Sequence, residues 1–206
     1  MKNKFLLLIS CFAITGKLFS QTVSIHYDVE LVAQPDSCTC WAASSSMILS
    51  YHEDAKTTSY NPAPTVKQII DKVNNTSGFK YDISCGLSPE DTKPVSEILG
   101  LSFEQPQCYG VEGFVQILKR KGPVVFMRAA LGNKGAHAIA VNGMHGDGTP
   151  EGTTVETLNP SPVGIGAAQN VKFSDLMKKM EQLGFWDGTD WAKSGGKDRV
   201  YIIYRK

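Results

Sequence analysis

The hydrophobic pattern of this 206-residue chain changes character near its middle, and that change constrains the fold more than any other feature. From residue 40 to residue 121 apolar residues recur mostly at helical spacing, and segment 40–51 is apolar nearly all round, as in a buried helix. From residue 123 onward, short runs rich in β-branched and aromatic residues take over. Helices in one half and strands in the other predict an α+β fold whose two lobes meet at a cleft.

The boundaries of the expected elements follow from apolar spacing and from the turn residues between them. Thr65 is expected to cap a short helix, and Lys121-Gly122 to end a longer one. Helices are predicted at 40–51, 66–73, near 94–99, at 111–120 and at 173–183. Strands are predicted at Ser24–Ala33, Pro123–Met127, Ala136–Met144, Thr153–Leu158 and Val200–Tyr204.

The first twenty residues have the three parts of a secretory signal peptide. Two lysines precede an apolar run from Phe5 to Ile14 that is too short to span a bilayer, and small and polar residues follow. We expect residues 1–20 to be removed and residues 21–206 to form one domain, which makes the protein secreted or periplasmic. Two alternatives stay open, an uncleaved N-terminal anchor and a lipoprotein attached through Cys11, and both also imply export. No other stretch of the sequence is long and apolar enough to span a membrane.

The charge balance excludes a nucleic-acid binder that works through its overall charge. Lys and Arg total 21, Asp and Glu total 20, and the formal net charge is +1. The expected signal peptide holds three lysines and no acidic residue, so 18 basic and 20 acidic residues remain, a net charge of −2. Binding to a phosphate backbone by bulk electrostatics requires a strongly basic chain, and we therefore expect no nucleic-acid partner.

The decapeptide Gln34–Ala43 holds the first candidate for chemistry, Cys40, at the point where a loop enters the buried helix. The N-terminal end of a helix carries roughly half a positive charge, which lowers the pKa of a thiol and favours the thiolate. The free backbone N–H groups there can also hold an oxyanion, and Gln34 can fold back to add an amide donor. The simpler alternative for a secreted protein is a Cys40 that is buried or disulfide-bonded.

A nucleophilic thiol needs a general base, and His137 is the best placed of the four histidines. His137 opens an apolar strand, Gly135–Gly143, in which small residues flank the imidazole. The structural alternative is a histidine that only completes the strand. We expect His137 to be the base that acts on Cys40.

The turn sequence Gly146–Pro150 predicts a hairpin between the strand of His137 and the strand that follows. If the hairpin is centred on Gly148, His137 directly faces Asn159, and opposed side chains lie about 5 Å apart on one face. An asparagine at that place would orient the imidazole. A one-residue slip would put Asn159 on the other face. Asn159-Pro160 alone is also typical of a turn cap.

The segment around Cys40 resembles the papain-like cysteine proteases. That family carries Gln, five residues and then Cys-Trp-Ala at the start of its central helix, a spacing that Gln34 and Cys40 match. The resemblance implies a Cys-His-Asn triad of Cys40, His137 and Asn159. It also implies that the Gln34 side chain and the Cys40 N–H form the oxyanion hole. The interval from Cys38 to Cys40 is one residue shorter than in Cys-Gly-Ser-Cys-Trp, so the resemblance is to the superfamily rather than to its cathepsin branch.

The stretch from His137 to Gly166 resembles a bacterial branch of the superfamily that includes proteases injected by plant pathogens. In that branch a histidine and an apolar strand precede Gly-Asp-Gly-Thr-Pro, Gly-Thr, Asp/Asn-Pro and Pro-Val-Gly, all of which this chain has in that order. The branch often has Asp where this chain has Asn159, and both side chains accept a hydrogen bond from histidine. The resemblance covers about Ala33 to Phe173.

This resemblance implies a papain-like two-lobe fold. The N-terminal lobe is expected to be helical, with the nucleophile at the start of its central helix, and the C-terminal lobe to be an antiparallel β-sheet. We expect a monomer that acts on a peptide or protein substrate.

Cys38, Cys85 and Cys108 remain once Cys11 is removed and Cys40 is assigned as nucleophile, so at least one has no partner within the chain. A Cys38–Cys85 bridge would correspond to the family's bridge beside the nucleophile, and Cys85–Cys108 is an equally simple choice. The Cys and His spacings lack a zinc pattern and the acidic residues form no calcium loop, so we expect no metal or other cofactor.

Three functions are compatible with these features. The first is a secreted bacterial cysteine peptidase. The second uses the same fold for acyl transfer, for hydrolysis of a non-peptide amide or for cleavage of a leader peptide. The third is a binding module on an inactive protease scaffold. The joint presence of four expected site residues favours an enzyme over an inactive binding module, and the peptidase is the leading hypothesis. These residues are Gln34, Cys40, His137 and Asn159.

Overall fold

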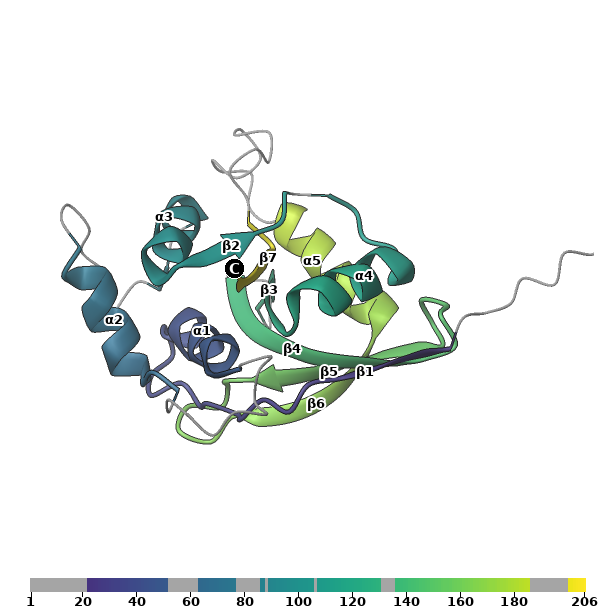
Figure 1. The fold of residues 1–206 in the computed structure, drawn as a ribbon, viewed down its shortest axis with the longest axis horizontal. Coiled ribbons are helices and arrows are strands. Elements are labelled where there is room, and N and C mark those ends of the chain that lie inside the picture. The colour runs from purple at the N-terminus through teal and green to yellow at the C-terminus, as the bar shows by residue number, and fades with distance from the viewer. Residues whose placement is uncertain are drawn as a thin grey trace, which may run out of the picture.

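One antiparallel sheet runs through the described part of the chain and separates two groups of helices (Figure 1). Within the described residues there are five helices and seven strands, so the fold is α+β, as predicted, and agrees with the papain-like architecture expected above. The computed structural model describes residues 22–51, 63–76, 86–87, 89–105, 107–130, 136–185 and 200–206.

The strands are ordered β2-β7-β3-β4-β5-β6, and β1 pairs with β4. The longest strand, β4, has 11 residues and contacts three others: β3 along its first half, β1 along its second half, and β5 on its other edge. This makes β4 the centre of the sheet. The strands are β1 (Val23–His26), β2 (Leu101–Phe103), β3 (Val124–Ala129), β4 (Ala136–Gly146), β5 (Thr153–Asn159), β6 (Ala167–Lys172) and β7 (Ile202–Arg205).

The helices cover both faces of the sheet. α1, α2 and α3 share one hydrophobic cluster with one face, and α4 and α5 share a second cluster with the other face. Figure 1 shows the two groups on either side of β3 and β4. The helices are α1 (Cys40–Ser50), α2 (Val66–Asn74), α3 (Pro89–Leu99), α4 (Val111–Lys121) and α5 (Phe173–Phe185).

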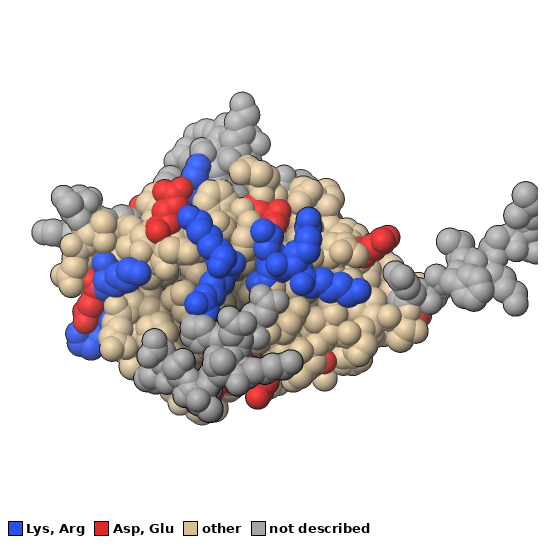
Figure 2. All heavy atoms as spheres, viewed as in Figure 1, with Lys and Arg blue, Asp and Glu red and all other residues tan. Residues whose placement is uncertain are grey.

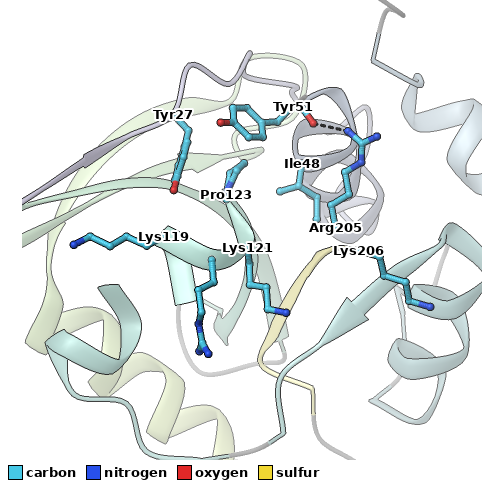
Figure 3. Close-up of a pocket in the computed structure, with 10 residues that line it drawn as sticks. Tyr27, Ile48, Tyr51, Lys119, Lys121, Pro123, Arg205 and Lys206 are labelled. Carbon is cyan, nitrogen blue, oxygen red and sulfur yellow. Dashed lines mark hydrogen bonds between the residues drawn. The ribbon is translucent and has the colours of Figure 1, made fainter. Parts of the chain in front are cut away.

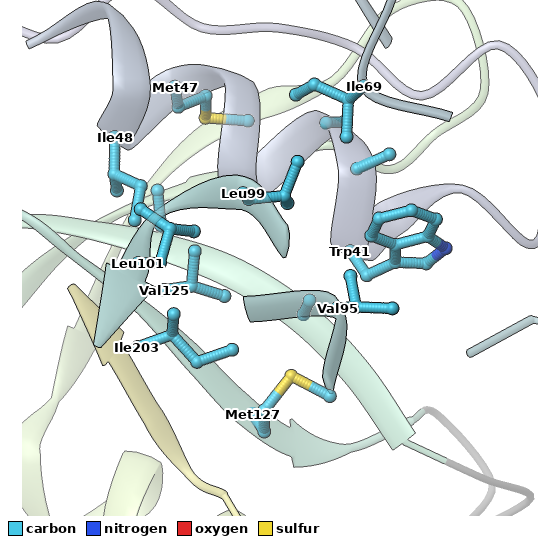
Figure 4. Close-up of a cluster of buried hydrophobic side chains, with 14 of the residues drawn as sticks. Trp41, Met47, Ile48, Ile69, Val95, Leu99, Leu101, Val125, Met127 and Ile203 are labelled. Carbon is cyan, nitrogen blue, oxygen red and sulfur yellow. The ribbon is translucent and has the colours of Figure 1, made fainter. Parts of the chain in front are cut away.

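Alternate residues of β3 show how the two clusters are divided. Val125 and Met127 belong to the cluster of α1, whereas Phe126 belongs to the cluster of α4 and α5. Phe126 meets Phe114 of α4 edge to face, with ring centroids 5.9 Å apart. Figure 4 shows the first cluster, in which side chains of α1 such as Met47 lie over the sheet. Because both faces of β3 and β4 are buried, the positions of these strands are held firmly.

Helix α1 is buried on nearly every side, as its composition predicts. The eight consecutive residues from Trp41 to Ile48 are all buried. Ser46 donates its hydroxyl hydrogen to Pro64 O at 2.6 Å, which satisfies a polar group inside the apolar cluster. The helix ends at Ser50, one residue short of the prediction. Packing therefore fixes the direction of α1 and with it the place of its first residue, Cys40.

The predicted helix signals at Thr65 and Gly122 are confirmed. Thr65 and Gln68 form a capping box: Thr65 Oγ1 accepts from Gln68 N at 3.2 Å, and Gln68 Oε1 accepts from Thr65 N at 2.8 Å. Gly122 ends α4 with a φ of 75° and donates its N–H to Leu118 O at 2.8 Å. A Cβ at Gly122 would lie 3.3 Å from the Tyr51 ring, so both φ and space favour glycine there.

The predicted strand Ser24–Ala33 is wrong beyond its first residues, because β1 spans only Val23–His26. After β1 the ladder to β4 continues with Tyr27, whose N–H donates to Asn142 O at 2.7 Å. From there on β3 pairs with the same edge of β4. The chain beyond Tyr27 therefore cannot continue along this edge of β4, although its apolar residues alternate.

Other boundaries also differ from expectation. Neither β2 nor β6 is predicted, because β2 has three residues and β6 is an edge strand with mostly exposed side chains, so both lack apolar alternation. α3 begins at Pro89 rather than near Pro94, and proline is well suited to the first turn of a helix. The last strand begins at Ile202 and α5 extends to Phe185.

The hairpin of β4 and β5 has the predicted turn but a different register. Next to the turn His145 pairs with Thr154, so the numbers of paired residues add to 299. Beyond an irregularity at Asn142, Ala140 pairs with Leu158 and the numbers add to 298. The predicted direct pairing of residues 137 and 159 is therefore wrong. One extra residue in β4, Asn142, forms a β-bulge.

The bulge decides which face of the sheet Asn159 takes. The numbers of His137 and Asn159 add to 296. This differs by three, an odd number, from the sum of 299 for paired residues next to the turn, and by two, an even number, from the sum of 298 beyond the bulge. Because side chains alternate between faces, an odd step would put the two residues on opposite faces. The bulge makes the step even, and the pair become diagonal neighbours on one face, still within reach of long side chains.

Among the described residues, none of the helices is long and apolar enough to cross a membrane.

The bulge also leaves no room for a side chain at Gly143. A Cβ there would lie 2.7 Å from Ile25 O and 2.6 Å from Glu156 Oε2. We expect Gly143→Ala to lower the free energy of unfolding by about 1–3 kcal/mol, measured by urea denaturation. Gly113→Ala is the matched control, because a Cβ on this exposed helical glycine meets nothing within 4 Å and is expected to stabilise by about 0.5–1 kcal/mol. Equal stability of Gly143→Ala and wild type would contradict the close packing described.

Candidate active site

Cys40 is the first residue of α1, as predicted, and the turn before it is held by Asp36. Asp36 Oδ1 accepts from Cys38 N at 2.8 Å, and Asp36 O accepts from Thr39 Oγ1 at 3.4 Å. Thr39 is fully buried as the N-cap, and its side chain makes no capping bond to the helix. The backbone N–H groups of the first turn of α1 are therefore not covered by an N-cap side chain.

The surroundings of the Cys40 thiol favour its neutral form. Burial is the largest effect and raises the pKa of Cys40 above its ordinary value. Hydrogen bonds from the backbone of Ala138 and Trp41 act in the opposite direction. The expectation that the helix end makes this thiol acidic is therefore wrong for the free protein, because the loss of water outweighs the backbone donors. The contact with Ala138 places the thiol beside the first residues of β4.

His137 and Asn159 are joined by a hydrogen bond of 2.8 Å between Nε2 and Oδ1. The same Asn159 Oδ1 also accepts from Ser161 N at 3.0 Å, which fixes the amide with its oxygen toward these two donors. An oxygen can only accept, so His137 Nε2 carries the hydrogen. In the neutral ring, Nδ1 is then the nitrogen that can accept a proton. Asn159 is 9% exposed, which shields the bond from water.

The pKa of His137 lies below its ordinary value. Burial is the largest cause, the hydrogen bond to Asn159 works against it, and the positive charge of Arg128 adds to the lowering. The imidazole is therefore neutral at neutral pH in the free protein.

Gln34 lies on the loop before α1, and its backbone is tied to the loop after β5. Its N–H donates to Pro160 O at 3.0 Å, and its carbonyl accepts from Gly164 N at 2.8 Å. The side chain is buried at 4% exposure, and its Oε1 has no hydrogen-bond partner among the described residues. Because rotation of the amide would break no bond at Oε1, this end of Gln34 can be presented as either donor or acceptor to a bound group.

The geometry brings the predicted residues together from separate parts of the chain. The loop after Asn159 is hydrogen-bonded to the backbone of Gln34, and the amide of Asn159 holds His137. The strand of His137 contacts the thiol of Cys40 through Ala138. A thiol, an oriented imidazole and nearby polar donors are the parts needed for nucleophilic attack on a carbonyl carbon.

Arg128 is a member of the site that the sequence reasoning misses. It lies on β3 directly across from His137, is 8% exposed, and its Nε has no hydrogen-bond partner in the part of the chain described. Burial lowers the pKa of Arg128, and attraction to Cys40 works against that lowering. In the sequence, Arg128 is the single charged residue in the apolar run Pro123–Ala129. Because an unpaired charge is costly to bury, a charge in a buried strand indicates a functional role.

The remaining predictions about cysteines and metals are tested only in part. Cys108 is exposed, and neither Cys40 nor Cys108 forms a disulfide in the described structure. Cys85 lies outside the described residues, so both suggested bridges to it stay predictions. Among described residues, no cluster of three or more His, Cys, Asp or Glu side chains has the arrangement of a metal site.

Comparison with known proteins identifies one family. The family model described as papain-like cysteine protease AvrRpt2 matches residues 19–176, which is more than half of the chain. The matched region includes all of the predicted site residues. No curated protein matches the chain.

The charge of Arg128 predicts how the pH profile of peptide hydrolysis responds to its removal. Without this cation the protonated form of His137 is less disfavoured and the thiolate of Cys40 less favoured, so both pKa values rise. We expect Arg128→Met to move both limbs of the kcat/KM profile to higher pH. Arg128→Lys, which keeps the charge, is expected to stay close to wild type. The melting temperature of Arg128→Met should not fall, because the variant removes a buried charge that has no ion-pair partner among the described residues. An active variant with the wild-type pH profile would contradict this role of Arg128.

Proposed function

The chain belongs to the papain-like cysteine protease family, and from this premise we propose that it hydrolyses peptide bonds through a triad of Cys40, His137 and Asn159. The observation that carries the proposal is the 2.8 Å hydrogen bond between His137 Nε2 and Asn159 Oδ1. This bond leaves Nδ1 as the nitrogen that accepts a proton from the thiol. The family match supports a cysteine protease, and the geometry supports these residues as its catalytic groups.

The first half of the reaction forms an acyl-enzyme. Cys40 Sγ attacks the carbonyl carbon of the substrate amide while His137 Nδ1 takes the thiol proton. The carbonyl oxygen becomes an oxyanion, which accepts hydrogen bonds from the backbone N–H of Cys40 and the side-chain amide of Gln34. His137 then gives its proton to the leaving amine, the C–N bond breaks, and a thioester remains on Cys40.

The second half of the reaction releases the acid. His137, neutral again, removes a proton from water, and the water oxygen attacks the thioester carbonyl. The oxyanion forms in the same place, the C–S bond breaks, and His137 returns the proton to the thiolate. Asn159 keeps the imidazole in one orientation through both halves, because its amide oxygen is held by the Ser161 N–H as well.

Because the thiol and the imidazole are both neutral before substrate binds, the reaction depends strongly on the donors that stabilise the oxyanion. Burial raises the pKa of Cys40 and lowers that of His137, so the thiolate–imidazolium pair is disfavoured before substrate arrives. Proton transfer then accompanies attack, and stabilisation of the oxyanion must offset the cost of the new charges. Gln34 is buried and its Oε1 has no hydrogen-bond partner among the described residues, so its amide can turn an N–H toward the oxyanion without breaking a bond at Oε1.

We also propose that the protein is exported by a bacterium and acts as a monomer on peptide or protein substrates, with residues 1–20 as signal peptide and residues 21–206 as the mature domain. The charged, apolar and small-residue parts of the N-terminal segment support export. The family match begins at residue 19, next to the proposed cleavage point. The intact mass of the exported protein tests this, with Gln21 as the expected first residue and an uncleaved or lipid-modified mass as the contrary result.

Cleavage of a peptide library in the presence of a thiol reductant tests the proposed function. We expect wild type to cut peptides and Cys40→Ala to lose at least about 10³-fold in kcat/KM, because the nucleophile is gone. Cys108→Ala is the matched control, since Cys108 is exposed and outside the site, and it should keep full activity. Peptide cleavage by Cys40→Ala at the wild-type rate would overturn the assignment of the nucleophile. Wild-type turnover confined to non-peptide amides or acyl acceptors would favour the acyltransferase or amidase alternative.

A second variant tests the role of the hydrogen bond to His137. Asn159→Ala removes the acceptor and should lower kcat by about 10²-fold or more, with a smaller change in KM. Asn159→Asp keeps an acceptor at the same place and should retain most of the activity. A fully active Asn159→Ala would contradict the orienting role.

A further inference from the structure

A cavity of about 360 Å³ lies at the end of α1 opposite to Cys40, and we call it the basic pocket. Half of its ten lining residues are cationic and none is acidic. Figure 2 shows Lys and Arg gathered on this face of the molecule, and Figure 3 shows the cavity between the ends of α1, α4 and β7. The cations are Lys119, Arg120, Lys121, Arg205 and Lys206.

Contacts with the protein hold two of these cations in place. Arg205 Nη1 donates to Tyr51 O at 2.7 Å, as the dashed line in Figure 3 marks. Lys121 Nζ lies 4.3 Å from the ring centroid of Tyr204, a cation–π contact. Side chains that are already ordered lose less entropy when a ligand binds, so these two cations are prepared for an anion.

Helix dipoles do not balance the charge of the basic pocket. The C-terminal ends of α1 and α4 both lie here, and each contributes about half a negative charge. That sum is small beside five positive side chains. In the part of the chain described, no carboxylate side chain forms an ion pair with Lys119, Arg120 or Lys121. No carboxylate side chain of the described residues therefore relieves the mutual repulsion of Lys119, Arg120 and Lys121, and a bound anion would do so.

We propose that the basic pocket binds a compact polyanion that carries closely spaced phosphate or sulfate groups. A volume of about 360 Å³ suits a small ligand. Arginine matches the oxygens of such groups with paired N–H donors, and lysine adds point charges. Tyr27 and Tyr51, packed edge to face with centroids 5.2 Å apart, add a wall of the cavity that is not charged.

The basic pocket is separate from the catalytic site and goes beyond the proposed function. Cys40 is the first residue of α1, and Ile48 and Tyr51 of the pocket lie at its other end. At 1.5 Å per residue, the 11 residues of α1 place the two sites about 16 Å apart. Peptide hydrolysis and anion binding can thus be measured independently, and failure of one leaves the other standing.

Calorimetric titration of the full mature chain tests the proposal with three probes: tripolyphosphate, sucrose octasulfate and a hexaglutamate peptide. We expect at least one of the first two to bind, with Kd rising as salt is raised, because the contacts are ionic. The double variant Lys119→Gln/Arg120→Gln removes two lining cations and should weaken binding at least about tenfold. Lys178→Gln/Lys179→Gln on α5 is the matched control, since it removes the same charge outside the pocket.

The outcomes separate a built site from general charge attraction. Loss of binding in the pocket variant with wild-type affinity in the control supports the proposal. Equal weakening in both variants would show attraction to overall charge and would overturn it, as would no binding of either phosphate or sulfate probe. If hexaglutamate binds more tightly than both other probes, the proposed polyanion is wrong and the ligand of the basic pocket is an acidic peptide segment. Thermal melting of each variant without probe checks that the fold is intact.

Discussion

The β-bulge at Asn142 is the constraint on which the arrangement of the site depends. The turn between β4 and β5 sets a register that would put Asn159 on the face away from His137, and one extra residue in β4 reverses this. Asn142 is anchored where it stands, since its carbonyl and its side chain both bond to the backbone of Tyr27, at 2.7 and 3.2 Å. Gly143 follows because no side chain fits beside Ile25 O.

Burial is the second constraint, and it sets the protonation of the site. The same loss of water raises the pKa of the thiol and lowers that of the imidazole, so both groups rest uncharged. The Arg128 charge, opposite His137 on β3, lowers the pKa of His137 while it attracts Cys40. A buried guanidinium with no carboxylate partner among the described residues is unusual for a fold alone, and it links β3 to the chemistry at the start of β4.

Local sequence patterns predict those helix boundaries that depend on residues close together in the chain. A buried helix beginning at Cys40, the cap at Thr65 and the stop at Gly122 all follow from residues within one turn. The side chains of His137 and Asn159 do meet, but not through the predicted direct pairing, since the bulge that brings them onto one face is held by contacts with Tyr27, far away in the sequence. The early end of β1 has the same origin, because occupancy of a strand edge by β3 is not encoded near residue 27.

The central claim is that Asn159 fixes His137 with its hydrogen on Nε2 and leaves Nδ1 for the thiol of Cys40. Nitrogen-15 NMR of the histidine ring reports the tautomer directly, in wild type and in Asn159→Ala. The account predicts the Nε2–H tautomer for neutral His137 in wild type and a mixture of tautomers in the variant. A neutral His137 with its hydrogen on Nδ1 in wild type would contradict it, because Nε2 would then have no hydrogen to donate to Asn159 Oδ1.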